Sequence, residues 1–456
     1  MTDCVYFDIT DIVRYARHQD RVAGIPRVQI NLMSHLWNRH GAQRVRCVFH
    51  HPQRGGMFEF DPGPLLQTPE FDASTLMQRL GLETVHPYLP RQRTVKAYLR
   101  RYDDNKLLRA WKKAEVHVLA RWRPQRLAAL GLPRPVPAEA LPLLPLERLP
   151  AGAHYVLLNI DGREVLEFAA RHRAQGGHVV QLVHDLIPWV CPDLFKPERV
   201  REFTGWLDQV VALRPQMLAN SQWTARDLRG YLGDAAREFD IRVVPLAHEF
   251  FGRERNARVP AGSSVPGRLP TRPFVLCVGT LENRKNGVRL LRAWEQVVQR
   301  LGDAAPELVF GGALGWHIEE FLQVLATPSL AGHVRIVEAP SDQELAWLYG
   351  QCLFSTYPSL YEGWGLPVGE AAWFGKFCVA SDASSLPEVC GDLAAYVDPK
   401  NVEDIARGLI EAISDPAGLA RREQAIRAAP LRRWADVADD VYAAVTAGGD
   451  SGRKAA

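Results

Sequence analysis

Short apolar runs alternate along most of the chain with longer segments in which apolar residues recur at helical spacing. Several of these runs end at Gly, Asp or Pro, which is typical of buried strands. Between them, residues 27–37 and 285–301 each place their apolar side chains on one helical face. Near-continuous apolar strands alternating with helices predict parallel sheets covered on both faces, and therefore an α/β fold. We expect strands in CVYF, HVVQLV, IRVVPL, FVLCVG, LVFGG, VRIVEA, LFSTY and FCVAS.

Two stretches interrupt this pattern. Residues 252–272 are rich in Gly, Pro, Ser and Arg, so they predict a linker, and a new strand–loop–helix unit begins after them at Phe274. Residues 91–126 hold twelve Lys or Arg against three Asp or Glu. Residues 124–150 contain seven prolines, which exclude a long helix there.

These interruptions predict the domain boundaries. We expect an N-terminal domain over 1–255, with an insertion at about 91–150. A C-terminal domain follows over 273–430. A terminal helix over 431–448 is expected to pack back on the N-terminal domain.

Composition excludes several classes of protein. A net charge of only +3 in 456 residues is far below the basic excess typical of a nucleic-acid binder. The seven cysteines are scattered and include no CxxC pair, so neither a disulfide framework nor a zinc site is indicated. No signal-peptide pattern opens the chain and no apolar run is long enough to cross a bilayer. We therefore expect a cytoplasmic protein.

The richest chemistry lies in YPSLYEGWGLPVGEAAWFG, directly after the predicted strand LFSTY. Gly363 and Gly365 allow close approach of a ligand to the backbone, and Pro367 suits the first turn of a helix. The N–H groups at that helix start would form an anion site. Glu362 precedes the helix and Glu370 lies within it, so the two carboxylates can address different parts of one extended ligand. The alternative is a solvent-exposed acidic pair flanking an ordinary turn.

Several segments together resemble one family. EGWGLPVGEA resembles the EGFGLP…E signature of the retaining glycosyltransferase family 4. That resemblance implies the GT-B architecture, in which two Rossmann-like domains face each other across a cleft. Further matches cover roughly residues 24–40 and 155–440. They are FVLCVGTLENRKNGVRLLRAW, LVFGGALGW and SDASSLPEVCGDLAAYVDP in the second domain, and GIPRVQINLM, VHDLIP and ANSQWTARDL in the first.

The resemblance also implies residue roles. Glu370 would accept hydrogen bonds from the ribose, Glu362 would bind a hydroxyl of the donor sugar, and Lys285 would neutralise the diphosphate. The residues implied in catalysis are His184, Lys285 and Glu362. The residues implied in donor binding are Gly24, Arg27, Arg284, Lys285, Glu362, Gly363, Trp364, Gly365, Leu366 and Glu370.

Two of these positions leave alternatives open. His184 at the end of HVVQLV would donate a hydrogen bond to the sugar, or it is a packed strand-end histidine with Asp185 as a helix cap. Many relatives have Gly-Arg where this chain has Gly279-Thr280, so one phosphate-binding arginine is missing. Arg284 or Arg27 is expected to supply that charge.

The reaction implied by the resemblance is retaining transfer of a hexose, mannose or a rhamnose-like sugar, from a nucleotide donor. We expect GDP-mannose first and a dTDP- or UDP-sugar second, with a glycan or lipid-diphosphate-linked acceptor in bacterial surface polysaccharide synthesis. No Asp-x-Asp is present, so no metal and no other cofactor is expected. The alternatives are another GT-B enzyme, an epimerase or a phosphorylase, and a non-catalytic sugar-binding module.

The basic stretch over 91–126 interleaves its charges with aromatic and aliphatic residues. This composition suits peripheral contact with an anionic membrane, at the inner face of the membrane, where a lipid-linked acceptor lies. The alternative is a solvated, charged pair of helices. No nucleic-acid partner is expected.

Overall fold

The computed structural model describes residues 4–17, 24–66, 73–82, 95, 98–99, 102, 105–130, 132, 139–160, 162–260, 268–316 and 318–447. By contacts the chain divides into two compact units that do not follow its two sheets. Unit 1 comprises Met1–Gln181, Ala212–Arg214 and Val445–Ala456, and unit 2 comprises Leu182–Val211 and Pro215–Ala444. The domain boundaries expected from the sequence stay predictions.

The first sheet has eight strands in the order β4-β3-β2-β1-β5-β6-β7-β8. β1 pairs in parallel with β2 and with β5, whereas β3 pairs antiparallel with both β2 and β4. The structure therefore places a strand, β4, within residues 91–150, where the sequence predicts an insertion. Its strands are β1 (Val5–Asp8), β2 (Val45–His50), β3 (Met57–Phe60), β4 (Leu144–Leu146), β5 (His154–Leu157), β6 (His178–Val183), β7 (Gln216–Ala219) and β8 (Ile241–Val243).

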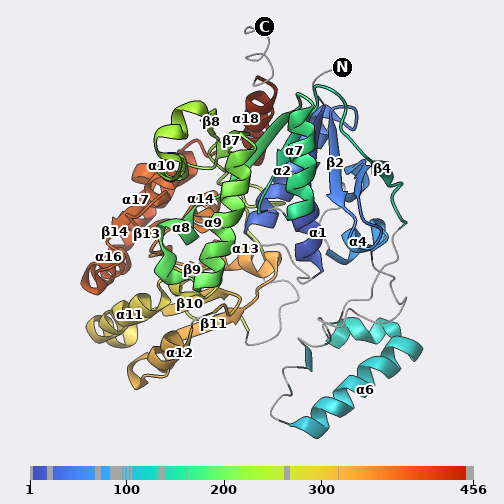
Figure 1. The fold of residues 1–456 in the computed structure, drawn as a ribbon. Coiled ribbons are helices and arrows are strands. Elements are labelled where there is room, and N and C mark those ends of the chain that lie inside the picture. Colours follow the sequence, from blue (N-terminus) through green and yellow to red (C-terminus); the bar gives the residue numbers. More distant parts are fainter. Residues whose placement is uncertain are drawn as a thin grey trace. The chain divides into compact units, whose positions relative to one another are not determined.

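The second sheet has six strands in the order β11-β10-β9-β12-β13-β14, and every recorded pairing is parallel (Figure 1). This order is that of a doubly wound Rossmann sheet, whose direction of winding reverses between β9 and β12. Its strands are β9 (Phe274–Val278), β10 (Glu307–Gly312), β11 (Val334–Glu338), β12 (Ser355–Tyr357), β13 (Cys378–Ser381) and β14 (Ala395–Val397). The strand expected to begin at Phe274 is confirmed, as are the other seven expected strands.

Helices connect these strands. In the first part of the chain they are α1 (Thr10–Ala16), α2 (Ile25–His40), α3 (Gly63–Leu66), α4 (Ala73–Arg79), α6 (Lys106–Trp122), α7 (Arg163–Ala174), α8 (Ile187–Val190), α9 (Pro197–Ala212) and α10 (Gln222–Leu232). In the second part they are α11 (Gly287–Leu301), α12 (Glu319–Leu325), α13 (Asp342–Gln351), α14 (Leu366–Trp373), α15 (Leu386–Cys390), α16 (Val402–Ser414), α17 (Pro416–Ala428) and α18 (Trp434–Ala447). The helices expected over 27–37 and 285–301 are confirmed as α2 and α11.

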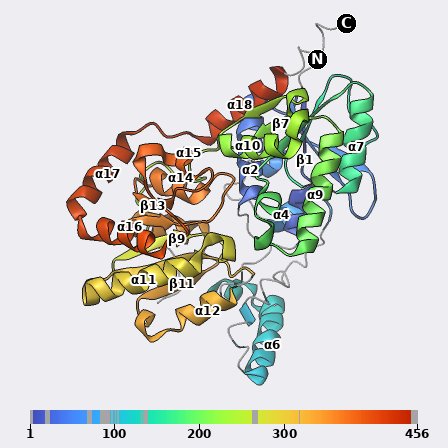
Figure 2. The same cartoon turned by 60° about the vertical axis from the view of Figure 1, so that its left-hand side comes forward.

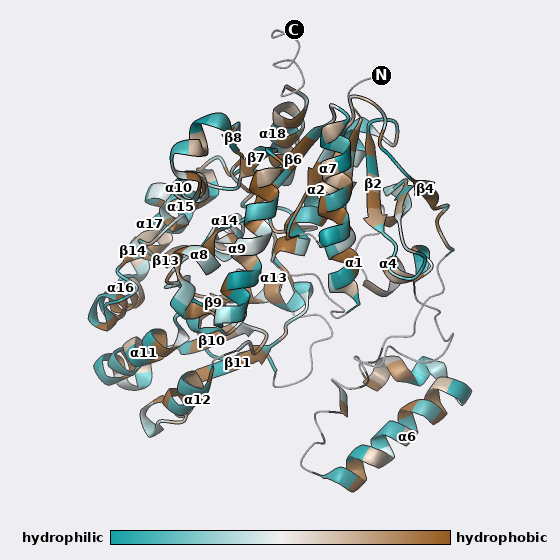
Figure 3. Ribbon diagram, viewed as in Figure 1, coloured by the Kyte–Doolittle hydropathy of each residue, from teal (hydrophilic) through white to brown (hydrophobic). Residues whose placement is uncertain are grey.

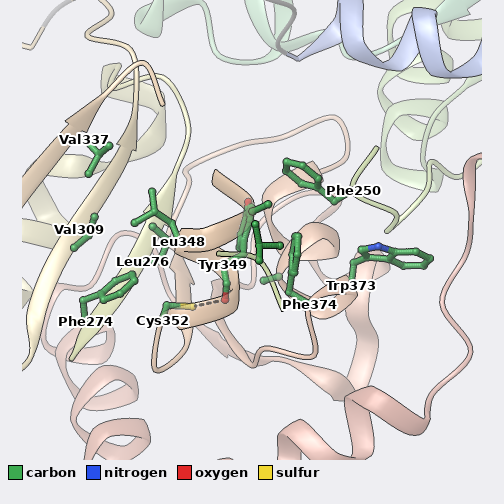
Figure 4. Packing of buried hydrophobic residues seen from close by; sticks show 13 residues of the cluster. Phe250, Phe274, Leu276, Val309, Val337, Leu348, Tyr349, Cys352, Trp373 and Phe374 are labelled. Atoms are coloured by element: carbon green, nitrogen blue, oxygen red, sulfur yellow. Dashed lines mark hydrogen bonds between the residues drawn. The ribbon is translucent and has the colours of Figure 1, made fainter. Parts of the chain in front are cut away.

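The second sheet is covered on both faces, as its apolar strands predict. On β10 the side chain of Phe310 meets Phe321 of α12 edge-on, with ring centroids 5.2 Å apart. α11 packs beside α12 and α16 (Figure 2). Successive residues of a strand point to opposite faces, so Val309 lies on the other side. There it joins the buried cluster of Leu348 and Tyr349 from α13 (Figure 4).

The last helix ends against strands of the first sheet. The carbonyl of Ala444 in α18 accepts hydrogen bonds from Gln216 of β7 at 3.0 Å and from Arg242 beside it at 3.2 Å. All three residues belong to unit 2. Nearer its start, Trp434 donates its ring N–H to the carbonyl of Glu249 at 3.0 Å.

Candidate functional site

The winding of the second sheet reverses between β9 and β12, and side chains of opposite charge meet at that point. The chain leaves β9 through Gly279 and reaches Arg284 and Lys285 in a short 3₁₀ turn before α11. It leaves β12 at Tyr357 and reaches Glu362 in the loop before α14. Ligands of doubly wound folds bind at the carboxyl ends of the strands beside such a reversal.

The carboxylate of Glu362 lies at the centre of this cluster of charged side chains. Its Oε1 accepts hydrogen bonds from Lys285 Nζ at 2.6 Å, Ser359 Oγ at 2.6 Å and the Tyr357 hydroxyl at 3.0 Å. Its Oε2 lies 2.7 Å from a guanidinium nitrogen of Arg284. Glu362 is only 7% exposed, so these contacts act with little screening by water. The alternative of a solvent-exposed acidic side chain at this position is wrong.

This burial and pairing move the pKa values in both directions. Burial opposes ionisation of Glu362, but the charges of Arg284 and Lys285, with hydrogen bonds from Lys285 and Ser359, lower its pKa to about 2. Burial and the charge of Arg284 lower the pKa of Lys285. Burial and the Glu362 charge raise the pKa of the Tyr357 phenol well above its usual value. Glu362 is therefore an ionised hydrogen-bond acceptor at neutral pH.

Arg284 makes several contacts besides the one with Glu362. Besides Glu362 it contacts Glu282 Oε1 at 2.7 Å and the carbonyl of Tyr361 at 2.7 Å. Its own carbonyl accepts a hydrogen bond from the Leu360 N–H at 2.9 Å. These contacts suit a side chain that positions the loop, and both Arg284 and Lys285 place positive charge next to the Glu362 carboxylate.

Glu370 lies inside α14, as expected. The helix begins after Gly365, whose φ of 113° favours glycine, and Pro367 lies in its first turn. Glu370 is 6% exposed, and its Oε2 accepts a hydrogen bond from the Tyr349 hydroxyl at 2.9 Å. Tyr349 thereby fixes the direction of this carboxylate.

The strand end at His184 lies directly against the glycine loop. A Cβ at Gly363 would meet the His184 carbonyl oxygen at 1.9 Å, so only glycine fits there. The Gly363 carbonyl accepts a hydrogen bond from Thr224 Oγ1 at 3.2 Å. Asp185 Oδ1 accepts the N–H of Ile187, the first residue of α8, at 3.1 Å, and His184 is buried beside it. The two alternatives for His184 stay predictions. Burial raises the pKa of Asp185, partly opposed by the Arg284 charge.

The remaining predicted residues fall in three places. Trp364 is buried, and its carbonyl accepts the Ser385 hydroxyl at 2.8 Å. Leu366 begins α14. Gly24 caps the start of α2 with φ 59°, and Arg27 lies in the first turn of that helix. Gly24 and Arg27 belong to unit 1, whereas the other predicted site residues belong to unit 2.

Comparison with known proteins identifies the family. Residues 264–432, which contain Arg284, Lys285, Glu362 and Glu370, match the sequence profile of Glycosyl transferases group 1. The matched part of the chain belongs to this family. It is 26% identical over 265 residues to O-antigen chain mannosyltransferase B of Escherichia coli, an alignment that covers 56% of this chain and 68% of the relative.

Two further comparisons extend this result. The chain is 30% identical over 247 residues to the serotype-specific mannosyltransferase WbdA of Escherichia coli, covering 52% of this chain but only 30% of that protein. Its fold is similar to that of sucrose-phosphate synthase from Thermosynechococcus elongatus, with a TM-score of 0.54 at 15% identity over 99% of this chain and 98% of that one. The α/β GT-B fold of two Rossmann-like domains is confirmed.

Several side chains of this group 1 glycosyltransferase were not predicted from its sequence. Tyr357 and Ser359 contact Glu362 directly, and the Glu362 N–H donates to Ser384 Oγ at 2.8 Å. Tyr361 donates to Asp227 of α10. The signal that could have indicated Tyr357 is its place as a polar residue at the end of the predicted strand LFSTY. Ser384 offers no such signal.

A second polar network lies in unit 1 of the glycosyltransferase, at the carboxyl ends of β1 and β5. Asp11 Oδ2 accepts hydrogen bonds from Gln29 at 2.7 Å and from Asn159 at 2.9 Å. Asp8 accepts the Tyr155 hydroxyl at 2.5 Å, and burial raises the pKa of Asp8 to about 6. The direction in which the first sheet is wound reverses between β1 and β5. These side chains therefore lie at the same kind of reversal in the first sheet as the Glu362 site does in the second. In the sequence, the two aspartates that follow CVYF, Asp8 and Asp11, are the signal that could have indicated this polar network.

No group of three His, Cys, Asp or Glu within the described ranges could hold a metal ion. The expectation of a metal-independent reaction stays a prediction. Among the same residues, no helix combines the length and apolar character needed to cross a membrane.

Proposed function

We propose that this chain is a retaining, metal-independent glycosyltransferase that moves a mannosyl group from GDP-mannose to a growing glycan or lipid-linked acceptor. The product would belong to a bacterial surface polysaccharide. The observation that carries this proposal is the ionised, buried Glu362 held between Lys285 and Arg284 at the sheet reversal. The names of the two Escherichia coli relatives support mannose as the sugar.

The side chains suit distinct parts of the donor. An ionised carboxylate is an acceptor only, so Glu362 binds hydroxyl groups of the sugar. The Lys285 ammonium, which contacts Glu362, pairs with the diphosphate as the nucleotide leaves. Glu370, oriented by Tyr349, accepts hydrogen bonds from the ribose. His184 donates a hydrogen bond to the sugar.

In the reaction the bond from the sugar carbon to the diphosphate breaks, and the acceptor oxygen forms a bond to the same carbon on the same face. The acceptor proton passes to the leaving phosphate oxygen, so no protein base is required. Lys285 stabilises the negative charge that grows on the diphosphate. Arg284 keeps Glu362 in place through Glu282 and the Tyr361 carbonyl.

A panel of GDP-, UDP- and dTDP-sugars, assayed with and without chelator, tests this function. We expect acceptor-dependent release of nucleoside diphosphate from GDP-mannose that chelator leaves unchanged, with a product of retained configuration. Conversion of the donor without transfer would identify an epimerase. Transfer from a sugar phosphate would identify a phosphorylase, and binding without turnover a sugar-binding module.

The ribose assignment has its own test. Glu370→Ala should lower the affinity for free nucleoside diphosphate, measured by calorimetry. Glu362→Ala should leave that affinity nearly unchanged but weaken binding of the nucleotide sugar. If Glu370→Ala bound the nucleotide as tightly as the parent, the ribose role would be wrong.

A further inference from the structure

Helix α6 (Lys106–Trp122) has two apolar faces. Its inner face places Val116 and Ala120 in a small core with Tyr98, Leu99 and Leu127. This face is therefore occupied by packing within unit 1. One apolar face is what an ordinary surface helix needs, so a second one requires another explanation.

The second face is a stripe of large exposed side chains. Leu107 is 85% exposed, Trp111 58%, Val118 57% and Trp122 74%. At about 100° per residue these four positions fall within about 60° of arc, on the side away from Val116 and Ala120. Figure 3 shows the hydrophobic and hydrophilic positions that alternate along this helix. Singly scattered exposed apolar residues are ordinary, whereas an aligned stripe marks an interaction surface.

Charge identifies the kind of partner. Residues 105–130 hold seven Lys or Arg and one Asp or Glu. The one acidic residue, Glu115, is already paired with Lys112 at 2.8 Å. The ammonium of Lys112 also lies 4.6 Å from the centre of the Trp111 ring, which places positive charge beside the stripe. The surface therefore offers an apolar strip bordered by cations.

We propose that this stripe, Leu107, Trp111, Val118 and Trp122, lies in the interface of an anionic lipid bilayer. A basic helix with Trp and Leu on one face and seventeen residues in length is typical of a helix that lies in the plane of the membrane. Trp prefers the level of the headgroups, where its ring is buried and its N–H is solvated. The exposed Lys106 and Arg121, on the side of the stripe nearest Leu107, then meet lipid phosphates.

The test is flotation of the full-length protein with lipid vesicles. We expect binding to vesicles that contain phosphatidylglycerol, weak binding to pure phosphatidylcholine, and loss of binding at high salt. Charge reversal by Lys106→Glu and Arg121→Glu together should lower partitioning by at least about tenfold. Trp111→Ala with Trp122→Ala should lower it while leaving some attraction to the anionic surface.

A matched control is Trp316→Ala, which removes a similarly exposed indole (51%) from unit 2 and should not change flotation. Thermal unfolding checks that each variant remains folded. The proposal is overturned if the parent fails to float with anionic vesicles, or if both α6 variants float as well as the parent. It is also overturned if the tryptophan variant converts a dimer to a monomer and floats normally, because a second copy would then cover the stripe. Flotation needs no substrate, so its outcome is separate from that of the proposed transfer reaction.

Discussion

The phenol of Tyr361 donates a 2.6 Å hydrogen bond to Asp227 of α10, and the ring N–H of Trp223 donates to the same phenol oxygen at 2.6 Å. Tyr361 directly precedes Glu362, and its carbonyl holds Arg284. These hydrogen bonds therefore link α10, which follows β7, to the loop that carries Glu362.

Tyr361→Phe should slow transfer without weakening nucleotide binding. The lost hydrogen bond is worth about 1 kcal/mol, so we expect a fall in kcat of about fivefold. The Kd of the nucleoside diphosphate should not change, because Glu370 lies in α14 and not in this loop. Tyr231→Phe is the matched control, since it removes a phenol–carboxylate hydrogen bond, to Asp208 at 2.5 Å, from the same helix. Equal kcat values for the two variants would show that Tyr361 has only a structural role.

Lys285→Met should remove most of the transfer activity. The loss of one preorganised charge at a leaving group costs about 10²–10³-fold in rate. Lys376→Met is a close control, because Lys376 pairs with Glu423 at 3.4 Å and has the same 16% exposed side chain as Lys285. Both variants should lose stability in thermal unfolding, but only Lys285→Met should lose turnover of the nucleotide sugar. A comparable loss of turnover in both would refute the specific role of Lys285.

The sequence predicted the second sheet more fully than the first for a physical reason. Strands β9, β10 and β13 are near-continuous apolar runs, because both faces of that sheet are covered. Strands such as β2 (VRCVFH) and β7 (QMLA) carry a charged or polar residue within a short run, and β14 has only three residues. Their strand character comes from pairing with neighbours and not from local pattern.

The features of the site also divide into local ones, which the sequence predicted, and long-range contacts, which it did not. The roles of the glycines and of Pro367 could be predicted from the neighbouring sequence, because backbone angles and helix starts depend mainly on nearby residues. The contact of Lys285 with Glu362 joins residues 77 positions apart, and that of Tyr361 with Asp227 joins residues 134 apart. Spacing along the chain contains no information on such contacts. The family resemblance indicated the first pair, and nothing in the sequence indicated the second.

Acid should remove the stability that Glu362 contributes. Its pKa of about 2 in the folded protein lies below the ordinary 4.5, so the ionised form stabilises the fold above pH 4.5. That contribution, roughly 3 kcal/mol, disappears as the pH falls from 4.5 toward 2. Glu362→Gln should therefore be less stable than the parent at pH 7, and the difference should shrink on acidification, as measured by urea unfolding. Glu198→Gln, which alters an exposed pair with Arg201, should show no such narrowing.

Gly363→Ala tests the close approach of His184 to the glycine loop. The new Cβ would lie 1.9 Å from the His184 carbonyl oxygen and 2.9 Å from Asp185 Cβ, so the backbone must move. We expect a loss of about 3 kcal/mol in the free energy of unfolding, because overpacking against backbone cannot be relieved by a rotamer change. Gly205→Ala is the control: Gly205 lies inside α9 with nothing within 4 Å of the added methyl. That substitution should stabilise the protein by about 1 kcal/mol through helix propensity. Should both substitutions prove neutral, the strand end at His184 does not contact Gly363 in solution.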